Sequence, residues 1–368
     1  MTPHIVVLGA GYSGLIAAKL AARRTEGRVT LVNARDAFVE RVRMHELASG
    51  KTLPPRPIAE LLKGTGVEFV VDRVEHIDAE RRVVALTGQE IAYDVLVYAL
   101  GSRADLDSVP GVGEFAYTVA DVASAQRLHE RLQSEGSIAV VGGGLTGLEA
   151  VTELAESYPG RKVQLVTAGT LGAALSQRGQ RHLAKAFNRL GITRIENTRV
   201  VAVDEAGLQL ADGGRVNADI VAWTTGFEVP DIARKAGFAV DDNGRMLVDP
   251  TLRSVSHPEV SAIGDSAVVH PDGQHELRMA CATGIPMAGH AIRAITDRLN
   301  GREPRGLKFR YVNQCISLGR HDGLIQFVRP DDSPVEAVLT GRLAAKYKTA
   351  IVSGAFYSQR HPSIANLS

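Results

Sequence analysis

The segment Ile5-Val6-Val7-Leu8-Gly9-Ala10-Gly11-Tyr12-Ser13-Gly14 decides the fold of this 368-residue chain. Its first four residues form a short apolar run, which predicts a buried parallel strand. Residues 15–22 are rich in Ala and Leu and predict a helix. In Gly9-x-Gly11-x-x-Gly14, the first glycine permits a tight turn, the second lets the backbone approach a pyrophosphate, and the third lets helix pack on strand. The loop therefore predicts a dinucleotide-binding site at the N-terminus of a helix.

The same pattern returns as Ile138-Ala139-Val140-Val141-Gly142-Gly143-Gly144-Leu145-Thr146-Gly147. A helical segment follows it at 148–155, and each unit continues into a second strand, at 28–32 and at 162–166. One glycine motif alone would be weak support, but two in strand–loop–helix context favour nucleotide binding over a pair of chance glycine turns. The chain is therefore predicted to contain two βαβ units, a duplication of one nucleotide-binding design.

The residue that usually holds the ribose of the nucleotide is not acidic in either unit. The motif expects an acid about 20 residues on, at the end of the second strand, and the residues there are Asn33 and Thr167. An amide can still exchange hydrogen bonds with hydroxyl groups, so ribose binding at Asn33 is retained. The missing acid at Thr167 leaves NADH and NADPH both open. Arg178 and Arg181 either meet a 2′-phosphate or are solvated surface residues.

Composition and charge exclude several classes of protein. The 42 Lys and Arg against 41 Asp and Glu give a formal net charge of +1, which argues against binding to nucleic acid. The apolar start at 4–8 has no basic region and no cleavage site, so it is interpreted as a core strand. No run reaches the roughly 18 apolar residues of a membrane span. Two cysteines cannot build a disulfide framework, and we expect a cytoplasmic protein.

Further strands are predicted around the two units, at 67–71, 83–86, 93–102, 199–203, 207–210, 220–223 and 260–265. A helix is predicted at 280–299, in which Pro286 should either kink the helix or mark its first turn. Residues beyond about 303 are expected to form a separate tail with strand-like and helical parts. The 11 histidines show no metal-binding spacing, so no metal site is predicted.

Four motifs carry a resemblance to a known family: the two glycine loops, the segment 93–102, and Ala262-Ile263-Gly264-Asp265. In this order they resemble the two-dinucleotide-binding-domain flavoproteins of the pyridine-nucleotide-disulfide oxidoreductase superfamily. Over residues 1 to about 300 the chain looks most like type II NADH dehydrogenases and apoptosis-inducing-factor-like NAD(P)H:quinone reductases. The resemblance implies an α/β fold of two Rossmann-like domains, the second inserted in the first. We expect an FAD-binding domain at 1–115 and 246–302, an NAD(P)-binding domain at 116–245, and a small C-terminal α+β element at 303–368.

The resemblance also implies which residues bind the cofactors, with FAD on the first loop and NADH or NADPH on the second. It places Asp265 on the ribityl chain or pyrophosphate of FAD, and a helix N-cap is the alternative role for this residue. It places the backbone of Val74 against the adenine. Gly101 allows close passage of the chain beside the cofactor, although Leu100 stands where the family usually has threonine. The predicted cofactor-binding residues are Gly9, Ala10, Gly11, Tyr12, Ser13, Gly14, Asn33, Arg43, Val74, Ala99, Gly101, Gly142, Gly144, Leu145, Thr146, Gly147, Thr167, Gly226, Gly264 and Asp265.

Glu149, at the end of the second motif, is the predicted catalytic residue. The resemblance implies that its carboxylate lies near the nicotinamide and the flavin, where it tunes hydride transfer or relays a proton. The alternative is an acid that is stabilised by the first turn of its own helix.

The absence of cysteine from the segment 38–46 distinguishes this chain from the disulfide reductases of the superfamily. Disulfide reductases of this superfamily carry a redox cysteine pair just after the second strand, and this segment has no cysteine. Electrons must therefore leave the flavin directly. Arg41, Arg43 and His45 either line the flavin pocket or form the exposed basic face of a helix. Cys281 follows Asp265 closely enough to approach the flavin, with a buried free cysteine as the alternative, and Cys315 is far from it in the sequence.

The acceptor is predicted only as a quinone-like or other small molecule, because residues 280–286 lack the glutamine-containing quinone motif that is usual in type II NADH dehydrogenases. The tail at 341–352 is basic and partly amphipathic but short, which leaves dimer contact, domain packing and weak peripheral docking at the inner face of a membrane open. The predicted function is that of an FAD-dependent NAD(P)H:acceptor oxidoreductase. A ferredoxin-type reductase and a non-catalytic NAD(P)H-sensing flavoprotein are the alternatives.

Overall fold

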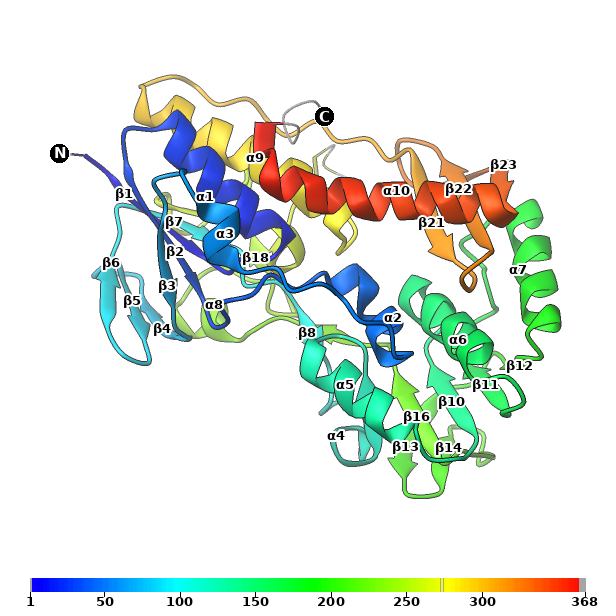
Figure 1. Ribbon diagram of the computed structural model, residues 1–368. Helices are drawn as coiled ribbons and strands as arrows, with labels where there is room; N and C mark the ends of the chain where they lie inside the picture. The colour runs from blue at the N-terminus through cyan, green and yellow to red at the C-terminus, as the bar shows by residue number, and fades with distance from the viewer. Residues whose placement is uncertain (1, 272, 274, 364–368) are drawn as a thin grey trace.

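A five-stranded parallel sheet forms the centre of the first half of the molecule (Figure 1). The computed structural model describes residues 2–271, 273 and 275–363. In spatial order the strands are β19 (Val260–Ala262), β7 (Val95–Tyr98), β1 (His4–Leu8), β2 (Arg28–Asn33) and β3 (Glu68–Val71). They are short, and the apolar residues of β1, β2 and β7 are almost all buried, as expected for the central strands of a parallel sheet, whereas the edge strand β3 is partly exposed.

Two long helices pack together against this sheet, α1 (Tyr12–Arg24) and α9 (Cys281–Leu299). Their apolar side chains share one core with the sheet strands. Helix α9 continues through Pro286, which lies in its second turn, so of the two predicted alternatives the first-turn position is wrong. The carbonyl of Ala282 is the one that loses its helical partner there, a loss confined to the N-terminal end of the helix. An antiparallel meander of β4 (Val74–Asp78), β5 (Val83–Leu86) and β6 (Glu90–Ala92) completes this half.

The second half repeats the first. Its five-stranded parallel sheet has the order β12 (Thr193–Ile195), β11 (Val163–Val166), β10 (Ile138–Val141), β16 (Ile220–Trp223) and β9 (Ala116–Thr118). The helices α5 (Val122–Arg131), α6 (Leu145–Ser157) and α7 (Gln177–Arg189) accompany it, with the meander β13 (Val200–Asp204), β14 (Gly207–Leu210) and β15 (Arg215–Asn217). The edge position that β19 fills in the first sheet is filled here by β9, which precedes β10 in the chain. The predicted α/β class with two Rossmann-like sheets, the second interrupting the first, is confirmed.

The C-terminal part consists of an antiparallel sheet and one helix. The sheet contains β21 (Asn313–Ser317), β22 (Gly323–Val328) and β23 (Pro334–Thr340), and α10 spans Gly341–Arg360. Helix α10 is longer than the short amphipathic segment that the sequence predicts. It packs on this sheet at one end and reaches α1 at the other, so that it connects both halves (Figure 1). Among the described helices, none combines the length and apolar character needed to cross a bilayer.

One segment of the first half crosses into the second. The single turn η1 (Arg41–Arg43) and helix α2 (Met44–Ala48) follow β2, yet Met44 and Ala48 are buried in the core around α5 and α6. This crossing brings the residues after β2 to the junction of the two halves. The remaining short elements are α3 (Ile58–Leu62), β8 (Arg103–Ala104), α4 (Val112–Phe115), β17 (Phe227–Glu228), α8 (Ile232–Lys235), β18 (Met246–Leu247), η2 (Gly264–Ser266) and β20 (Ala267–Val268).

Candidate cofactor and acceptor site

The first glycine loop connects β1 to α1, and its geometry leaves room for a phosphate group. Gly9 has φ +95°, and a Cβ there would lie 2.4 Å from the carbonyl oxygen of Ala99. A Cβ at Gly14 would lie 1.9 Å from the carbonyl oxygen of Gly9, whereas one at Gly11 would meet no atom within 4 Å. No side chain caps the N-terminus of α1, so its first N–H groups can bind an anion. The loop fits the pyrophosphate of a dinucleotide.

The second loop, between β10 and α6, has the same construction. Gly142 has φ +119°, and a Cβ at Gly147 would lie 1.9 Å from the carbonyl oxygen of Gly142. A Cβ at Gly144 would again meet no atom within 4 Å. Helix α6 begins at Leu145 and Thr146 without a side-chain cap. The two loops therefore present two equivalent places for a nucleotide, one in each half.

Asn33 and Thr167 lie at the two equivalent strand ends. The Oδ1 atom of Asn33 accepts a hydrogen bond from the N–H of Ala10 at 2.9 Å, and its Nδ2 atom donates to the carbonyl of Arg35 at 2.7 Å. Asn33 thus supports the glycine loop directly. Thr167 is almost fully buried, with its hydroxyl against Gly143. Neither position provides an acid.

Arg178 and Arg181 lie exposed on α7. The backbone N–H groups of Gln177 and Arg178 donate to the carboxylate of Glu336, at 2.9 and 3.2 Å, which fixes the start of α7 on β23. These contacts favour the solvated interpretation of both arginines, and they leave NADH and NADPH open. Val74 is the first residue of β4 and pairs with Leu86, just beyond the end of β3.

Asp265 belongs to a polar cluster at the end of β19. The hydroxyl of Ser102 donates to Asp265 Oδ2 at 2.7 Å. Arg41 Nη1 donates to the carbonyl of Ser102 at 2.7 Å and lies 3.7 Å from Asp265 Oδ2. Gly101, with φ +69°, and Gly264, with φ +71°, form the tight turns beside these residues. Ile263 is the residue before the turn η2, and Asp265 makes no capping bond there, so the N-cap interpretation of Asp265 is wrong.

Arg43 lies one residue before Met44, at the start of α2, and its predicted contact with the cofactor stays a prediction. Its guanidinium forms an ion pair with Glu46 at 3.1 Å, and the residue that lies beside Asp265 is Arg41. His45 is buried, and Arg41 and Arg43 are both partly buried. The prediction that these three residues form the exposed basic face of a helix is therefore wrong, because α2 is packed against the second half of the molecule.

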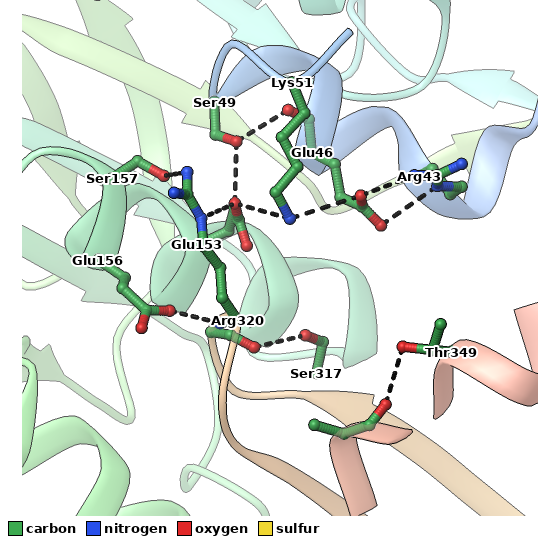
Figure 2. A network of polar contacts seen from close by, with 12 residues as sticks. Arg43, Glu46, Ser49, Lys51, Glu153, Glu156, Ser157, Ser317, Arg320 and Thr349 are labelled. Atoms are coloured by element: carbon green, nitrogen blue, oxygen red, sulfur yellow. Dashed lines mark hydrogen bonds and ion pairs between the residues drawn. The ribbon is translucent and has the colours of Figure 1, made fainter. Parts of the chain in front are cut away.

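Figure 2 shows the network of which Arg43 and Glu46 are part. Its centre is Glu153 of α6, which is 2% exposed. The Glu153 carboxylate accepts from the Ser49 hydroxyl at 2.9 Å and pairs with Lys51 and with Arg320, each at 3.3 Å. Ser49 and Lys51 follow α2, and Arg320 lies in the loop between β21 and β22. The network therefore ties together α6, the crossing segment and the C-terminal sheet.

Glu149, one turn earlier on α6, is buried and paired with a residue from the other end of the chain. Its Oε1 atom lies 2.8 Å from Lys348 Nζ on α10 and accepts the N–H of Ser317 at 3.0 Å. Burial alone would raise the pKa of Glu149, but Lys348 and then His45 outweigh it, so this pKa lies below its usual value. Burial would lower the pKa of Lys348, and Glu149 raises it. Both groups are charged at neutral pH. The alternative in which the first turn of α6 alone stabilises Glu149 is incomplete, because the main partner of the carboxylate is Lys348.

The two cysteines lie next to this ion pair. Lys348 Nζ also donates to the carbonyl of Cys315 at 3.2 Å, and the charges of Lys348 and Asp265 both act on the Cys281 thiol. Burial raises the pKa of Cys281, and it raises the pKa of Cys315 to about 11. Both cysteines are free and half-buried, and Cys281 packs against the apolar core of the first half. They remain protonated at neutral pH, which fits thiols that carry no nucleophilic role.

A small cavity of about 50 Å³ lies where the two halves meet. Arg41 and Ala104 line it from the first half, and Thr146, Gly226 and Phe227 from the second. Gly226 has φ +72°, and its carbonyl accepts the N–H of Asp105 at 3.0 Å, which joins the two halves at this point. The cavity thus lies between the start of α6 and the Arg41–Asp265 cluster.

Comparison with known proteins places the chain among related sequences. The family model for pyridine nucleotide-disulphide oxidoreductases matches residues 3–293. The chain belongs to this family. Membership confirms the predicted family, the oxidoreductase class, and the pairing of FAD with a pyridine nucleotide.

Several members of the family are similar to this chain over most of their length. An NADH dehydrogenase-like protein of Mycobacterium tuberculosis is 31% identical over 346 residues, covering 86% of each chain. A type II NADH:quinone oxidoreductase of Staphylococcus haemolyticus is 26% identical over 392 residues, covering 96% of this chain and 95% of the relative. The sulfide:quinone oxidoreductase of Aquifex aeolicus has the same fold, with a TM-score of 0.84, 21% identity, and coverage of 98% of this chain and 92% of that one.

Three contributors to the site could not be found from the sequence. Lys348, Ser317 and Arg320 belong to the C-terminal part, and each contacts α6 from a distant position in the chain. Their residue types carry no local signal, because a lysine in a basic helix and an arginine in a loop are both common on surfaces.

Proposed function

We propose that the protein oxidises NADH or NADPH with FAD and passes the electrons to a quinone-like acceptor beside Lys348. The buried Glu149–Lys348 ion pair carries this proposal, because it places a charged proton donor at the junction of both halves and the C-terminal part. The absence of cysteine from 38–46 excludes a dithiol relay at that position. The names of the relatives, which include NADH:quinone oxidoreductases, support a quinone as the acceptor.

Within this proposal the first half, at 1–115 and 246–302, holds FAD. The open face at Gly11 and the uncapped start of α1 would receive the pyrophosphate. Asp265 would meet the ribityl chain from its cluster with Ser102 and Arg41. The segment at 116–245 would hold NADH or NADPH through Gly144 and the start of α6. When bound, FAD supplies the redox chemistry that links the two-electron donor to the acceptor.

The residues of the chain would then supply protons and orientation. Reduction of a quinone to its hydroquinone needs two electrons and two protons. The hydride of NAD(P)H supplies both electrons and one proton, so one further proton must come from the solvent. The Lys348 ammonium can donate a proton to the acceptor, and Glu149 holds that ammonium in place at 2.8 Å. The N–H of Ser317 fixes the other side of the carboxylate. Glu149 and Lys348 would therefore act as one proton-relaying pair, with residues 303–368 forming the acceptor side.

The exposed face of α10 is proposed to make a weak peripheral contact with the inner face of a membrane, where quinones dissolve. Leu343, Ile351 and Tyr357 are exposed on it, at 66%, 46% and 52%. The helix contains no Asp or Glu, so its charge suits anionic lipids. Sedimentation with phosphatidylglycerol vesicles tests this contact: Leu343→Glu should reduce binding, and a concentration-dependent dimer without vesicle binding would contradict it.

The function is tested first by anaerobic absorbance titration of the purified holoenzyme with NADH and then with NADPH. Rapid bleaching of the flavin bands by one nucleotide identifies the donor, and reoxidation by a soluble quinone identifies the acceptor class. Glu149→Gln should bleach at the normal rate but reoxidise slowly with quinone. Gln133→Glu, an exposed change on another surface, serves as the control. Flavin bands that neither nucleotide bleaches would contradict the proposal, as would a protein that binds no FAD.

A further inference from the structure

A second hollow lies away from both glycine loops, between α1, α3 and the C-terminal end of α10. Its volume is about 570 Å³, within the range of small-molecule sites. Lys19 and Arg23 line it from α1, Lys63 from the end of α3, and Arg360 from the end of α10. Figure 1 shows the end of α10 beside α1. The mechanism proposed above uses none of these residues.

Cations outnumber acids among the residues that line this hollow. Four cations line it, and Glu60 is the one acid among the lining residues. None of the ion pairs among the described residues includes any of these four cations. By contrast, the buried carboxylates Glu40, Glu149, Glu153 and Asp322 are each paired with a cation. Like charges held around one space repel each other. A bound anion would convert that repulsion into attraction.

Lys19 shows how the hollow is built. Its side chain is only 7% exposed, and its ammonium donates to the carbonyls of Gln359 at 2.6 Å and Arg360 at 3.3 Å. Burial and then the charge of Arg360 lower the pKa of Lys19. Lys19 therefore closes the C-terminus of α10 and forms the floor of the hollow. Arg23 donates to the hydroxyl of Ser363, and Lys63 is exposed at the rim.

We propose that this hollow binds the phosphate group of a phosphorylated small molecule or of a phospholipid headgroup. Arginine and lysine donors are the groups that proteins use for phosphate. The three cations Arg23, Lys63 and Arg360 come from three different elements and face the same space. The volume admits a ligand larger than phosphate alone, with Leu61 and Pro362 as apolar contacts.

The site is separate from the proposed FAD pyrophosphate site. Arg23 lies about 16 Å along α1 from Tyr12, at the rise of an α-helix, and the phosphate-binding end of α1 is its N-terminus. An anion in the hollow would tie α1, α3 and the end of α10 together. Because α10 also carries Lys348, the ligand would stabilise the helix that forms the acceptor side.

Calorimetric titration of the oxidised holoenzyme with sodium phosphate tests the site, at constant ionic strength and with saturating NAD⁺ to fill the second glycine loop. The double variant Arg23→Gln/Lys63→Gln leaves Lys19 intact and should bind phosphate at least tenfold more weakly. The charge-matched control Arg178→Gln/Arg181→Gln, on the exposed face of α7, should bind as the natural protein does. Equal binding by all three proteins overturns the proposal.

Two further arms distinguish the source of the phosphate. Glycerol 3-phosphate that binds the natural protein, but not the double variant, identifies a soluble ligand. Sedimentation with phosphatidylglycerol vesicles, but not with phosphatidylcholine vesicles, identifies a lipid headgroup if the double variant alone loses it. Failure of both arms overturns the site. No turnover is measured, so the result is independent of the proposed electron acceptor.

Discussion

The two glycine loops have the same backbone but different surroundings. In the first loop Gly9, Ala10, Tyr12 and Gly14 are buried, whereas the matching residues of the second loop are half-exposed except for the last, Gly147. The first loop is covered by distant parts of the chain. Gln359 of α10 donates to the carbonyl of Tyr12 at 3.3 Å. The second loop meets threonine side chains, with Gly142 against Thr224 and Gly143 against Thr167.

This difference matches the proposed roles of the two loops, one for a retained cofactor and one for a cofactor that exchanges. A nucleotide on the first loop would be enclosed by α9 and α10, since a Cβ at Gly284 would lie 2.3 Å from Ser13 Oγ. A nucleotide on the second loop would reach solvent more directly. Under the proposed function, the same local motif would serve both a tightly held FAD and an NAD(P)H that enters and leaves in each turnover.

The loops also differ two residues after the third glycine. The first unit has Ile16 there, completely buried in the apolar core, and the second has Glu149, buried as a charge. An isoleucine serves packing alone. A buried carboxylate requires a partner, and Lys348 provides it.

The largest effect is expected from Lys348→Met, which leaves Glu149 buried without its cation. We expect a loss of about 3–5 kcal/mol in the free energy of unfolding, measured by urea denaturation. In the natural protein the low pKa of Glu149 contributes stability above its unfolded pKa, which is lost as the pH falls. In the variant, burial raises that pKa, so the deficit should grow from pH 5 to pH 8. Lys346→Met, on the exposed side of α10, is the control.

The double variant Glu149→Ile/Lys348→Met makes the second unit resemble the first. Most of the lost stability should return, because no buried charge remains. Bleaching of the flavin by NAD(P)H should continue, and reoxidation by quinone should slow. A double variant that reduces quinone normally would show that the difference between Ile16 and Glu149 has no catalytic meaning.

Gly14→Ala and Gly147→Ala introduce the same 1.9 Å contact into the two loops. Each should cost about 1–3 kcal/mol of stability, but with different consequences for the cofactors. Gly14→Ala should be purified largely without FAD. Gly147→Ala should keep its flavin and lose NAD(P)H binding. Absorbance at the flavin bands and a nucleotide titration measure the two outcomes, and loss of FAD from both variants would contradict the assignment of the loops.

Gly144→Ala places a methyl group in open space, since no atom lies within 4 Å of its Cβ position. Unfolding should be unchanged, and the Kd for the nicotinamide nucleotide should rise about tenfold, or about 1.4 kcal/mol. Ala168→Gly, just beyond Thr167 at the end of β11, is the control for a small change nearby. Unchanged affinity would show that the phosphate does not approach Gly144.

The smallest effect is expected from Gln359→Leu, which removes the hydrogen bond to Tyr12 but keeps the volume of the side chain. The loss is about 1 kcal/mol, and FAD should dissociate about fivefold faster. Gln177→Leu, exposed at the start of α7, should have no effect. Stopped-flow fluorescence of released flavin measures both rates. Equal rates would show that the cover over the first loop does not retain the cofactor.

The arrangement of each unit could be predicted because its causes are local. Gly14 and Gly147 are required by the carbonyls of Gly9 and Gly142 in their own loops, and the spacing of these glycines is visible in the sequence. The buried strands likewise follow from short apolar runs. The helix at 280–299 was also predicted, but not that Pro286 lies in its second turn.

The sequence by itself determined the two βαβ units, their glycine loops and the nucleotide chemistry that they support, because a strand, a tight turn and a helix depend on neighbouring residues. Only the tertiary structure decided which side chains meet around them. Arg41 with Asp265, Glu153 with Arg320 and Glu149 with Lys348 join residues that are far apart in the chain. The free energy of such a pair depends on burial and distance, and neither is set until both cores have packed.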